Sequence, residues 1–351
     1  MAAGPVALES RLPSNVQVHS LRGGRPRFMW ELRRLHGRLA RERRFDVAHQ
    51  LNPVDVGVSL ALAGGQAPLV LGPYWPDWAP SGPGADAHVG PLALRVKRVI
   101  RGAQQRRAAT LLLSTPAAVS QLAPGVQAHV HELPLGIDDH AWHPAPEAPA
   151  GQTVLFLANL EVRKGIHVLL DAFEALAARL PDARLQVAGD GPEGDAVKRR
   201  VRESPALDRV ELLGRVDREG VLGLMQACDV YCLPSYGEPF GLSALEAMAC
   251  ARPVVVTDAG GLQHVVPDAG SRKVPPGDSA ALASALAEVL GDAELRLAMG
   301  SHNRMVVEET FTWSRVGDRL DQLYAAAMRR QPHAGRPERA GESHRPRPGR
   351  R

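Results

Sequence analysis

The chain has 351 residues, more than one typical domain holds, so we expect two domains with separate cores. Hydrophobic residues make up 44% of the sequence and charged residues 23%, which is typical of a soluble globular protein. No apolar run is long enough to cross a bilayer, and the N-terminus lacks the basic-then-apolar order of a secretory signal. We therefore expect a cytoplasmic protein.

The charge of the chain is unevenly placed. From Arg329 onward there are eight Arg and two Glu, a net charge of +6, so the whole-chain charge of +4 leaves −2 for residues 1–328. This tail, residues 329–351, is rich in Pro, Gly and Arg and is expected to be disordered. The folded body is not basic overall.

A second basic region spans residues 22–44. In it Phe28, Leu32, Leu35 and Leu39 recur at helical spacing, and such a stripe is more often core than membrane anchor. Contact of its arginines with an anionic lipid surface, at the inner face of the membrane, is the alternative left open. No nucleic-acid motif accompanies the region, so we expect no nucleic-acid partner.

The three cysteines argue against disulfides and zinc. Cys228, Cys232 and Cys250 are odd in number and lack paired CxxC spacing, so we expect reduced packing residues. No acidic pair or His cluster stands out as a metal site either. We predict no metal and no cofactor.

In the first half of the chain, strand and helix patterns alternate less completely than they do later. The expected strands are residues 16–20, 46–50, 68–72, 110–114 and 129–133, and the expected helices lie near residues 28–41, 53–63, 91–109 and 115–122. Residues 72–91, which include Trp75 and Trp78, have too much Pro and Gly for regular structure and are expected to form a loop.

From residue 153 the alternation becomes regular, which predicts βαβ units and a parallel sheet. The expected strands are residues 153–158, 184–189, 209–214, 229–234 and 252–257. The expected helices are residues 166–180, 193–203, 217–227, 241–251, 278–291, 293–308 and 312–328. The predicted organisation is an N-terminal Rossmann-like domain over residues 1–143, a Pro-rich linker over 144–151, a C-terminal domain over 152–328, and the tail over 329–351.

The stretch "PSYGEPFGLSALEAMACARPVVV" suggests the chemistry. It follows a strand and opens a helix, and in an open α/β sheet ligands bind at the carboxyl ends of strands. The amides of Phe240, Gly241 and Leu242 at the helix start suit phosphate oxygens. Glu238 and Glu246 would then lie beyond a diphosphate in two directions, where carboxylates can accept hydrogen bonds from sugar hydroxyls. A nucleotide sugar has this arrangement of groups.

The same stretch resembles the signature of retaining glycosyltransferases of GT-B fold, a group 1, family 4-like family with an E-x7-E motif, a buried strand and a Gly pair. The resemblance covers residues 129 to about 325. It is carried by "ELPLGID", "ANLEVRKGIHVLLDAF", "LQVAGDGPE", "VELLGRVDREGVLGLMQACDVYCLPS" and "GEPFGLSALEAMACARPVVVTDAGGLQHVV". It implies two Rossmann-like, doubly wound α/β domains that face a cleft, with the last helix packing back on the N-terminal domain.

The resemblance also implies roles for individual residues. Glu238 would bond the donor hexose, Glu246 the ribose, and the amides of Phe240, Gly241 and Leu242 the diphosphate. Lys164 would neutralise the leaving diphosphate, which helps to take the acceptor proton during transfer with retention. The other expected donor-side residues are Arg163, Asn159, Gly189, Gly191 and Val216. The acceptor is unknown, either lipid-linked or a small molecule.

Three departures from the family pattern stand out. Asn159 replaces a phosphate-binding Arg, His264 replaces Glu after the Gly pair, and no Gly-rich loop and first strand precede residue 16. Either the true start lies upstream, or the protein has lost part of its site; the alternative function is a non-catalytic partner or regulatory protein that keeps the fold and nucleotide binding. His49 and Tyr74 are the acceptor-side candidates, although a lone His at a strand end is more often structural. A dinucleotide-binding G-x-G-x-x-G after an early strand is absent, so we do not expect an NAD-dependent dehydrogenase.

Overall fold

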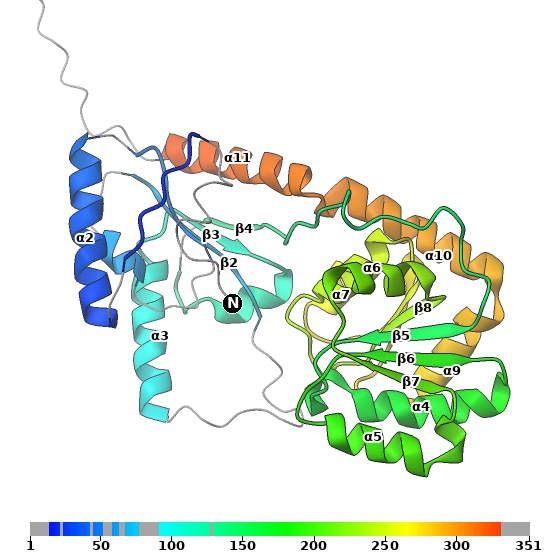
Figure 1. Cartoon of the computed structure of the whole chain (residues 1–351). Helices are drawn as coiled ribbons and strands as arrows, with labels where there is room; N and C mark the ends of the chain where they lie inside the picture. Colours follow the sequence, from blue (N-terminus) through cyan, green and yellow to red (C-terminus); the bar gives the residue numbers. More distant parts are fainter. Residues whose placement is uncertain are drawn as a thin grey trace, which may run out of the picture.

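The structure is a computed structural model that describes residues 14–21, 24–42, 45–51, 58–62, 67–76, 91–126 and 129–330. It contains two all-parallel sheets, one in each half of the chain, which form two lobes (Figure 1). None of the described helices is long and apolar enough to span a bilayer.

The N-terminal sheet has the strand order β1-β2-β3-β4. Its strands are β1 (Ala48–Gln50), β2 (Leu69–Tyr74), β3 (Thr110–Leu113) and β4 (His129–Glu132), and its helices are α2 (Arg25–Glu42) and α3 (Pro91–Gln105). Short 3₁₀ turns occupy Val58–Leu62 and Pro116–Gln121. The central strands are apolar and buried, which accounts for the parallel pairing seen here.

Several predictions for this half are wrong. Residues 16–20 form no strand, and most of that segment is exposed, so its β-branched residues have no sheet on which to pack. The helices expected near 53–63 and 115–122 are 3₁₀ turns where the structure describes them. Strand β2 continues through Tyr74 into the expected loop, and Trp78 lies outside the described residues.

The C-terminal sheet has six strands in the order β10-β9-β8-β5-β6-β7. They are β5 (Thr153–Leu157), β6 (Arg184–Ala188), β7 (Val210–Gly214), β8 (Val230–Leu233), β9 (Val254–Thr257) and β10 (Ser271–Val274). The first five confirm the predicted strands, whereas β10 was missed because "SRKV" is short and half polar. The strand order reverses between β5 and β8, which is the switch point where doubly wound sheets bind ligands.

Helices cover both faces of this sheet (Figure 1). One layer contains α4 (Ile166–Arg179), α5 (Gly194–Glu203) and α9 (Ser279–Gly291), and the other contains α6 (Arg218–Ala227), α7 (Leu242–Ala249) and α10 (Ala293–Val306). The short helix α8 (Leu262–Val265) follows β9. Asp217, Asp278 and Asp292 cap α6, α9 and α10 by accepting hydrogen bonds from backbone amides.

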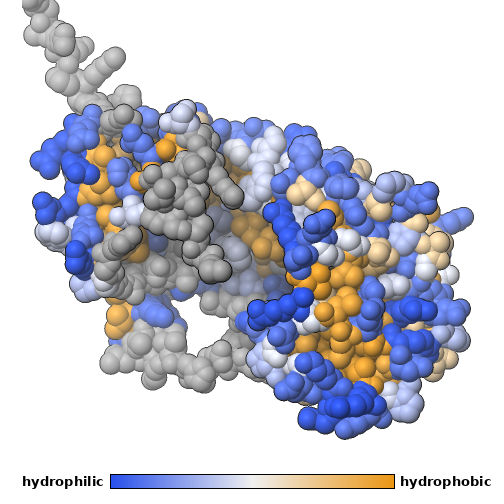
Figure 2. Space-filling view, viewed as in Figure 1, coloured by the Kyte–Doolittle hydropathy of each residue, from blue (hydrophilic) through white to orange (hydrophobic). Residues whose placement is uncertain are grey.

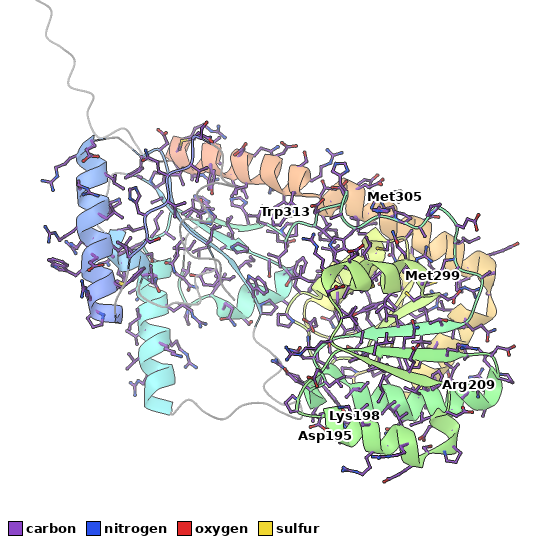
Figure 3. All side chains as sticks on the ribbon, viewed as in Figure 1. Asp195, Lys198, Arg209, Met299, Met305 and Trp313 are labelled. Atoms are coloured by element: carbon purple, nitrogen blue, oxygen red, sulfur yellow. The ribbon has the colours of Figure 1, made fainter. Side chains whose placement is uncertain are left out.

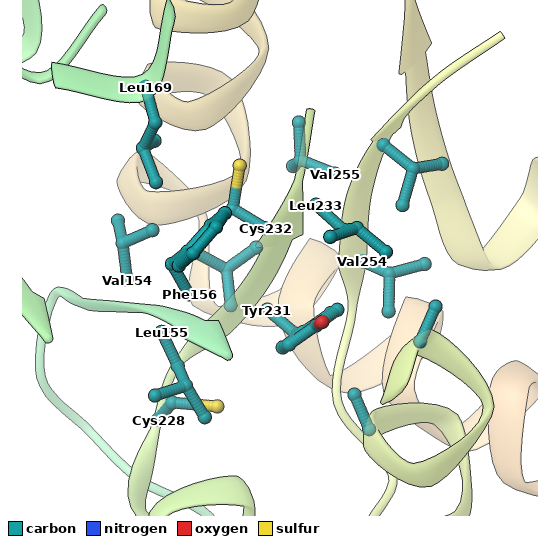
Figure 4. Packing of buried hydrophobic residues seen from close by; sticks show 14 of the residues in the cluster. Val154, Leu155, Phe156, Leu169, Cys228, Tyr231, Cys232, Leu233, Val254 and Val255 are labelled. Carbon is teal, nitrogen blue, oxygen red and sulfur yellow. The ribbon is translucent and has the colours of Figure 1, made fainter. Parts of the chain in front are cut away.

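The core of the C-terminal lobe lies between these layers (Figure 4). Phe156 and Tyr231 are fully buried on neighbouring strands, β5 and β8. The three cysteines are buried without disulfides, as predicted. Burial raises the pKa of the Cys228 and Cys250 thiols to about 12, so these side chains remain neutral and behave as small apolar residues.

The last helix, α11 (Trp313–Arg330), returns to the N-terminal sheet (Figure 1), as predicted. Its buried residues form one apolar cluster with β2, β3 and the end of β4, made up of Val70, Leu112, Leu133, Val316, Leu323 and Ala327. The N-terminal sheet therefore takes part of its core from the far end of the chain.

The chain crosses between the lobes twice at one place. Ile137 and Thr312 form an isolated parallel bridge, and the Ile137 amide donates to the Phe311 carbonyl at 2.7 Å. Trp313 lies at this junction (Figure 3), where a Cβ atom added to Gly136 would come within 2.5 Å of the indole. The Arg304 guanidinium donates to the carbonyls of Trp142 and Ala249, both at 2.9 Å. These bonds fix both crossings to the C-terminal lobe.

Candidate active site

Two loops meet at the switch point of the C-terminal sheet. The loop after β5 ends at Gly165, and the loop after β8 begins at Pro234. The Tyr236 amide donates to the Arg163 carbonyl at 2.9 Å, and a Cβ atom on Gly165 would lie 1.9 Å from the Pro234 carbonyl oxygen. Gly165 also has φ of 76°, a left-handed conformation that favours glycine. The side chains just before Gly165 are thereby held against the β8 loop.

The contact between the loops includes an ion pair. The Lys164 Nζ atom lies 2.7 Å from Glu238 Oε2, and the two side chains are only 15% and 11% exposed. These residues are 74 positions apart in sequence, yet they are the two that the sequence assigns to the reacting centre. The ion pair therefore links the β5 loop directly to the β8 loop.

The start of α7 presents backbone amides. Gly241 precedes the helix with φ of 92°, and a Cβ atom there would come within 2.5 Å of Leu262 Cδ2. In the described part of the chain, the N–H groups of Phe240, Gly241 and Leu242 donate to no backbone carbonyl. The Phe240 ring is buried and makes an edge contact with Phe311 at 6.4 Å between centroids. The first turn of α7 is thus fixed in position, and these three N–H groups donate to no backbone carbonyl of the described residues.

The Gly pair supports this loop from the other side. The Gly261 amide donates to the Glu238 carbonyl at 2.6 Å, and Gly260 forms an isolated bridge with Glu238. A Cβ atom on either glycine would lie within 2.4 Å of the loop backbone, on Glu238 or Pro239. The glycines are required because two backbones approach each other closely here. His264 is exposed on the following helix, α8.

Glu246 lies in the second turn of α7 and is half-buried. Burial raises the pKa of its carboxyl to about 7, and the nearby Arg218 opposes that rise. Among the described residues, no group hydrogen-bonds this carboxylate. A partly buried acid without a protein donor is suited to accept hydrogen bonds from a ligand.

Glycines bring the end of β6 next to the β5 loop. A Cβ atom on Gly189 would lie 1.9 Å from the Ala158 carbonyl oxygen, and one on Gly191 would lie 2.6 Å from the Leu160 carbonyl oxygen. Gly189 also has φ of 143°. Val216 is half-buried just before α6. All three predicted positions therefore lie at the carboxyl edge of the sheet.

Arg163 is placed by a neighbour that the sequence reasoning missed. The Glu161 carboxylate accepts a hydrogen bond from Arg163 Nε and lies 3.5 Å from Asn159 Nδ2. The Arg163 guanidinium lowers the pKa of Glu161. The acid thus holds a cation beside Asn159, the position where the family pattern has Arg. Only the alternating charges in "NLEVRK" hinted at this arrangement.

Tyr231 is a second residue that the sequence reasoning missed. Its hydroxyl lies 2.7 Å from Ser243 Oγ and donates to the Leu157 carbonyl at 3.1 Å. It therefore joins the end of β5 to the first turn of α7. Its place in a continuous apolar strand, "VYCL", gave no signal for this role.

The two acceptor-side candidates lie in the N-terminal lobe and have internal partners. His49 Nε2 donates to the Gly72 carbonyl at 2.9 Å, so its Nδ1 accepts from the Tyr324 hydroxyl at 2.6 Å. His49 thereby connects β1 to α11. Tyr74 is buried in β2, and burial raises its pKa. Their roles toward an acceptor remain predictions.

Comparison with known proteins identifies the C-terminal half. Residues 141–306 match the protein family described as Glycosyl transferases group 1. The C-terminal half is thus similar to group 1 glycosyltransferases. The matched region contains all the residues of the switch-point site, from Asn159 to Glu246.

Relatives and solved structures agree with this assignment. The chain is 35% identical over 200 residues to a phosphatidyl-myo-inositol mannosyltransferase of Mycobacterium leprae, covering 55% of this chain and 52% of that protein. It is 34% identical over 204 residues to a glycogen synthase of Mycobacterium tuberculosis, covering 56% of this chain and 49% of that protein. The chain thus spans about half the length of the curated relatives that it matches.

Similarity to solved structures extends over most of the chain. A sucrose-phosphate synthase from Thermosynechococcus elongatus superposes with a TM-score of 0.67 at 23% identity, over 87% of this chain and 80% of that one. The Anabaena protein HepE, in complex with UDP and glucose, gives 0.66 at 21% identity, over 85% and 81%. The chain has the GT-B fold of two Rossmann-like domains, which confirms the predicted fold class. The described residues contain no group of three or more metal-ligand side chains, and metal independence stays a prediction.

Proposed function

We propose that the chain is a retaining hexosyltransferase that moves a sugar from a nucleoside-diphosphate donor to an acceptor hydroxyl. The observation that carries the proposal is the contact of Lys164 with Glu238 beside the unused amides at the start of α7. These groups supply a cation, hydrogen-bond donors and an acid within one site at the switch point. Glu246 adds an acid further along the same helix.

Each group has a distinct task in this proposal. The amides of residues 240–242 bind the diphosphate, as oriented donors at helix starts do. Glu238 accepts hydrogen bonds from the hexose, and Glu246 accepts them from the ribose. Lys164 and Arg163 stabilise the charge that develops on the departing diphosphate. Asn159, Gly189, Gly191 and Val216 line the donor.

In the reaction, the bond between the anomeric carbon and the diphosphate oxygen breaks. A bond to the acceptor oxygen forms on the same face of the sugar. The acceptor proton passes to an oxygen of the leaving diphosphate, so no protein base is required. The protein contributes preorganised positive charge, which stabilises the transition state more than the bound donor.

The comparisons support a nucleotide-sugar donor and motivate a lipid-linked acceptor. HepE is described with UDP and glucose, and a pneumococcal transferase with UDP and GlcNAc. The mycobacterial mannosyltransferases among the relatives are named for a lipid acceptor, phosphatidyl-myo-inositol, whereas the glycogen synthase is not. We propose a cytoplasmic location, consistent with three cysteines that form no disulfide, and peripheral contact with the inner membrane face.

Nucleotide binding tests the donor site directly. One of UDP, GDP and ADP should raise the midpoint of thermal unfolding, because a ligand that binds only the folded state stabilises it. Glu246→Ala should weaken that nucleotide by about 10- to 100-fold, the effect of losing hydrogen bonds to a charged acceptor. Glu219→Ala, an exposed acid on α6, is the control and should leave binding unchanged. No stabilisation by any nucleotide would refute the proposal, and binding without transfer would favour the non-catalytic alternative.

Nucleotide affinity should also depend on pH through Glu246. The pKa of its carboxyl is raised to about 7 in the free protein, whereas hydroxyls that donate to the carboxylate favour the charged form. Binding therefore releases a proton, and affinity should increase about fivefold between about pH 6 and about pH 8. Calorimetry on wild type and Glu246→Gln isolates this effect, since phosphate titration is common to both. Parallel pH profiles for the two proteins would contradict it.

The same group affects stability with the opposite sign. Because the folded-state pKa of Glu246 is higher than its unfolded value, the folded protein binds the proton more tightly. This contribution to the free energy of unfolding is complete at acid pH and is lost as the pH rises through about 7. Without nucleotide, Glu246→Gln should therefore gain stability relative to wild type at alkaline pH.

A further inference from the structure

The outward side of α2 combines arginines with an exposed indole. Five arginines on this side are exposed: Arg27, Arg33, Arg34, Arg38 and Arg41. Trp30 is 58% exposed among them, with the Arg34 guanidinium stacked 4.6 Å from its ring centre. The apolar stripe from Phe28 to Leu39 is half-buried on the opposite side. The indole therefore contributes little to the packing of this helix against the lobe.

Helix α3 repeats the combination at the same end of the N-terminal lobe as α2 (Figure 1). Residues 95–99 are all exposed and read Arg-Val-Lys-Arg-Val. Val96 is 50% exposed and Val99 is 63% exposed, so two aliphatic side chains face solvent between three cations. Figure 2 shows apolar and strongly polar residues side by side at this end of the molecule.

The two halves of the chain carry opposite net charge. Residues 1–143 contain sixteen Lys and Arg against ten Asp and Glu, a net charge of +6. Residues 144–328 contain eighteen Lys and Arg against 26 Asp and Glu, a net charge of −8. An anionic surface would attract the first half and repel the second, which orients the molecule.

We propose that the outward sides of α2 and α3 form a docking surface for an anionic lipid bilayer. Arginines beside an indole are the combination that binds lipid headgroups and the interfacial layer. Val96 and Val99 favour lipid over nucleic acid, because aliphatic side chains can enter the acyl boundary but cannot stack on bases. The inference rests on the peripheral membrane contact of the proposed function and assigns it to one surface, which is separate from the switch-point site and does not depend on the proposed reaction.

Vesicle sedimentation with the full chain tests the docking surface. The protein should bind vesicles of phosphatidylcholine mixed with phosphatidylserine and should not bind phosphatidylcholine alone. Binding should weaken steeply with added salt, since the attraction is between exposed charges. Equal binding to neutral vesicles, or none to anionic ones, would overturn the proposal.

Matched variants locate the binding surface. Changing Arg33, Arg34, Arg38 and Arg41 to Gln should reduce vesicle affinity by at least about 100-fold, because each basic residue near the surface contributes separately. The control changes four exposed cations of the C-terminal lobe to Gln, namely Arg179, Lys198, Arg199 and Arg202, and should retain wild-type affinity. An equal loss in both variants would reduce the effect to net charge and refute the assignment.

The apolar contribution has its own pair of variants. Changing Trp30 and Val99 to Ser should weaken vesicle binding by about tenfold, whereas Leu297→Ser, at a side chain 56% exposed on α10, should have no effect. If instead vesicle binding is lost only when the arginines after residue 340 are changed to Ser, the tail binds the membrane and the proposal fails. Tighter binding of single-stranded RNA than of anionic vesicles would also overturn it.

A nucleotide readout keeps this proposal apart from the donor site. The α2 and α3 variants should keep the wild-type thermal shift with nucleotide, because their substitutions lie in the other lobe. Loss of vesicle binding with an intact nucleotide shift is the expected result. Loss of both would indicate that the substitutions unfold the protein and would remove the support for the surface.

Discussion

Lys164→Met is expected to lower the rate constant of hexosyl transfer by about 100- to 1,000-fold, the usual effect of removing one group that stabilises a developing anion. The change also leaves the Glu238 carboxylate without its partner in a site where both side chains are mostly buried. That loss should cost about 3 kcal/mol of unfolding free energy. Steady-state kinetics and thermal unfolding, measured on the same preparation, separate the two effects.

A double-mutant cycle and a surface control complete this test. In Lys164→Met with Glu238→Gln, most of the lost stability should return, because no unpaired charge remains, whereas transfer should stay slow. Lys198→Met removes an exposed lysine that lies 3.9 Å from Asp195 (Figure 3) and should change neither quantity. A folded Lys164→Met protein with transfer within threefold of wild type, roughly 0.7 kcal/mol, would rule out the assigned role.

Gly165→Ala is expected to be among the most damaging single-methyl changes in the site. Its left-handed backbone disfavours alanine by about 1 kcal/mol, and the added carbon would lie 1.9 Å from the Pro234 carbonyl oxygen. One of the two loops must move, so we expect a total loss of about 3 kcal/mol or more in unfolding free energy. Since Lys164 is adjacent, transfer should fall as well.

The matched control for this substitution is Gly223→Ala. Gly223 lies within α6, is exposed, and has no atom near the position of an added Cβ. Alanine should therefore stabilise the protein by about 0.5 to 1 kcal/mol through its higher helix propensity. Chemical denaturation of both variants tests the pair. Equal stability of Gly165→Ala and wild type would show that the two loops are not locked together as described.

The C-terminal lobe follows from sequence because its signals agree with one another. Runs such as "TVLFL" and "VVVT" are continuous and apolar, as strands buried on both faces must be, and the stripe in α4 ends at Leu180. Strand β10 escaped prediction because "SRKV" depends on β9 for its register and has little apolar character of its own. Strand β10 therefore forms because it pairs with β9, not because of its own residue preferences.

The N-terminal lobe is less predictable for a physical reason. Residues 16–20 alternate as a strand would, yet they pair with no strand in the described part of the chain. Residues 58–62 and 116–121 adopt 3₁₀ turns, which occur in short pieces as connectors. Local residue propensity does not determine which segments pair with a neighbouring strand.

In the site, too, motif residues could be predicted from the sequence, whereas residues that act through tertiary contacts could not. The spacing of Glu238 and Glu246 was readable, and the fold brings Lys164 to Glu238. The bonds made by Glu161 and Tyr231 were not readable, because each depends on a side-chain direction that residue type does not encode. The sequence therefore predicted which candidate groups would meet, whereas the side chains that hold them in place could be identified only from the structure.

The return of α11 to the first sheet has a consequence for engineering. A fragment cut at the Pro-rich linker would leave the apolar side chains of Val70, Leu112 and Leu133 bare and would be expected to aggregate. Chimaeras that exchange the N-terminal half with that of another protein of this fold should therefore exchange residues 313–330, or their equivalent, together with that half. The natural unit of exchange is discontinuous along the gene.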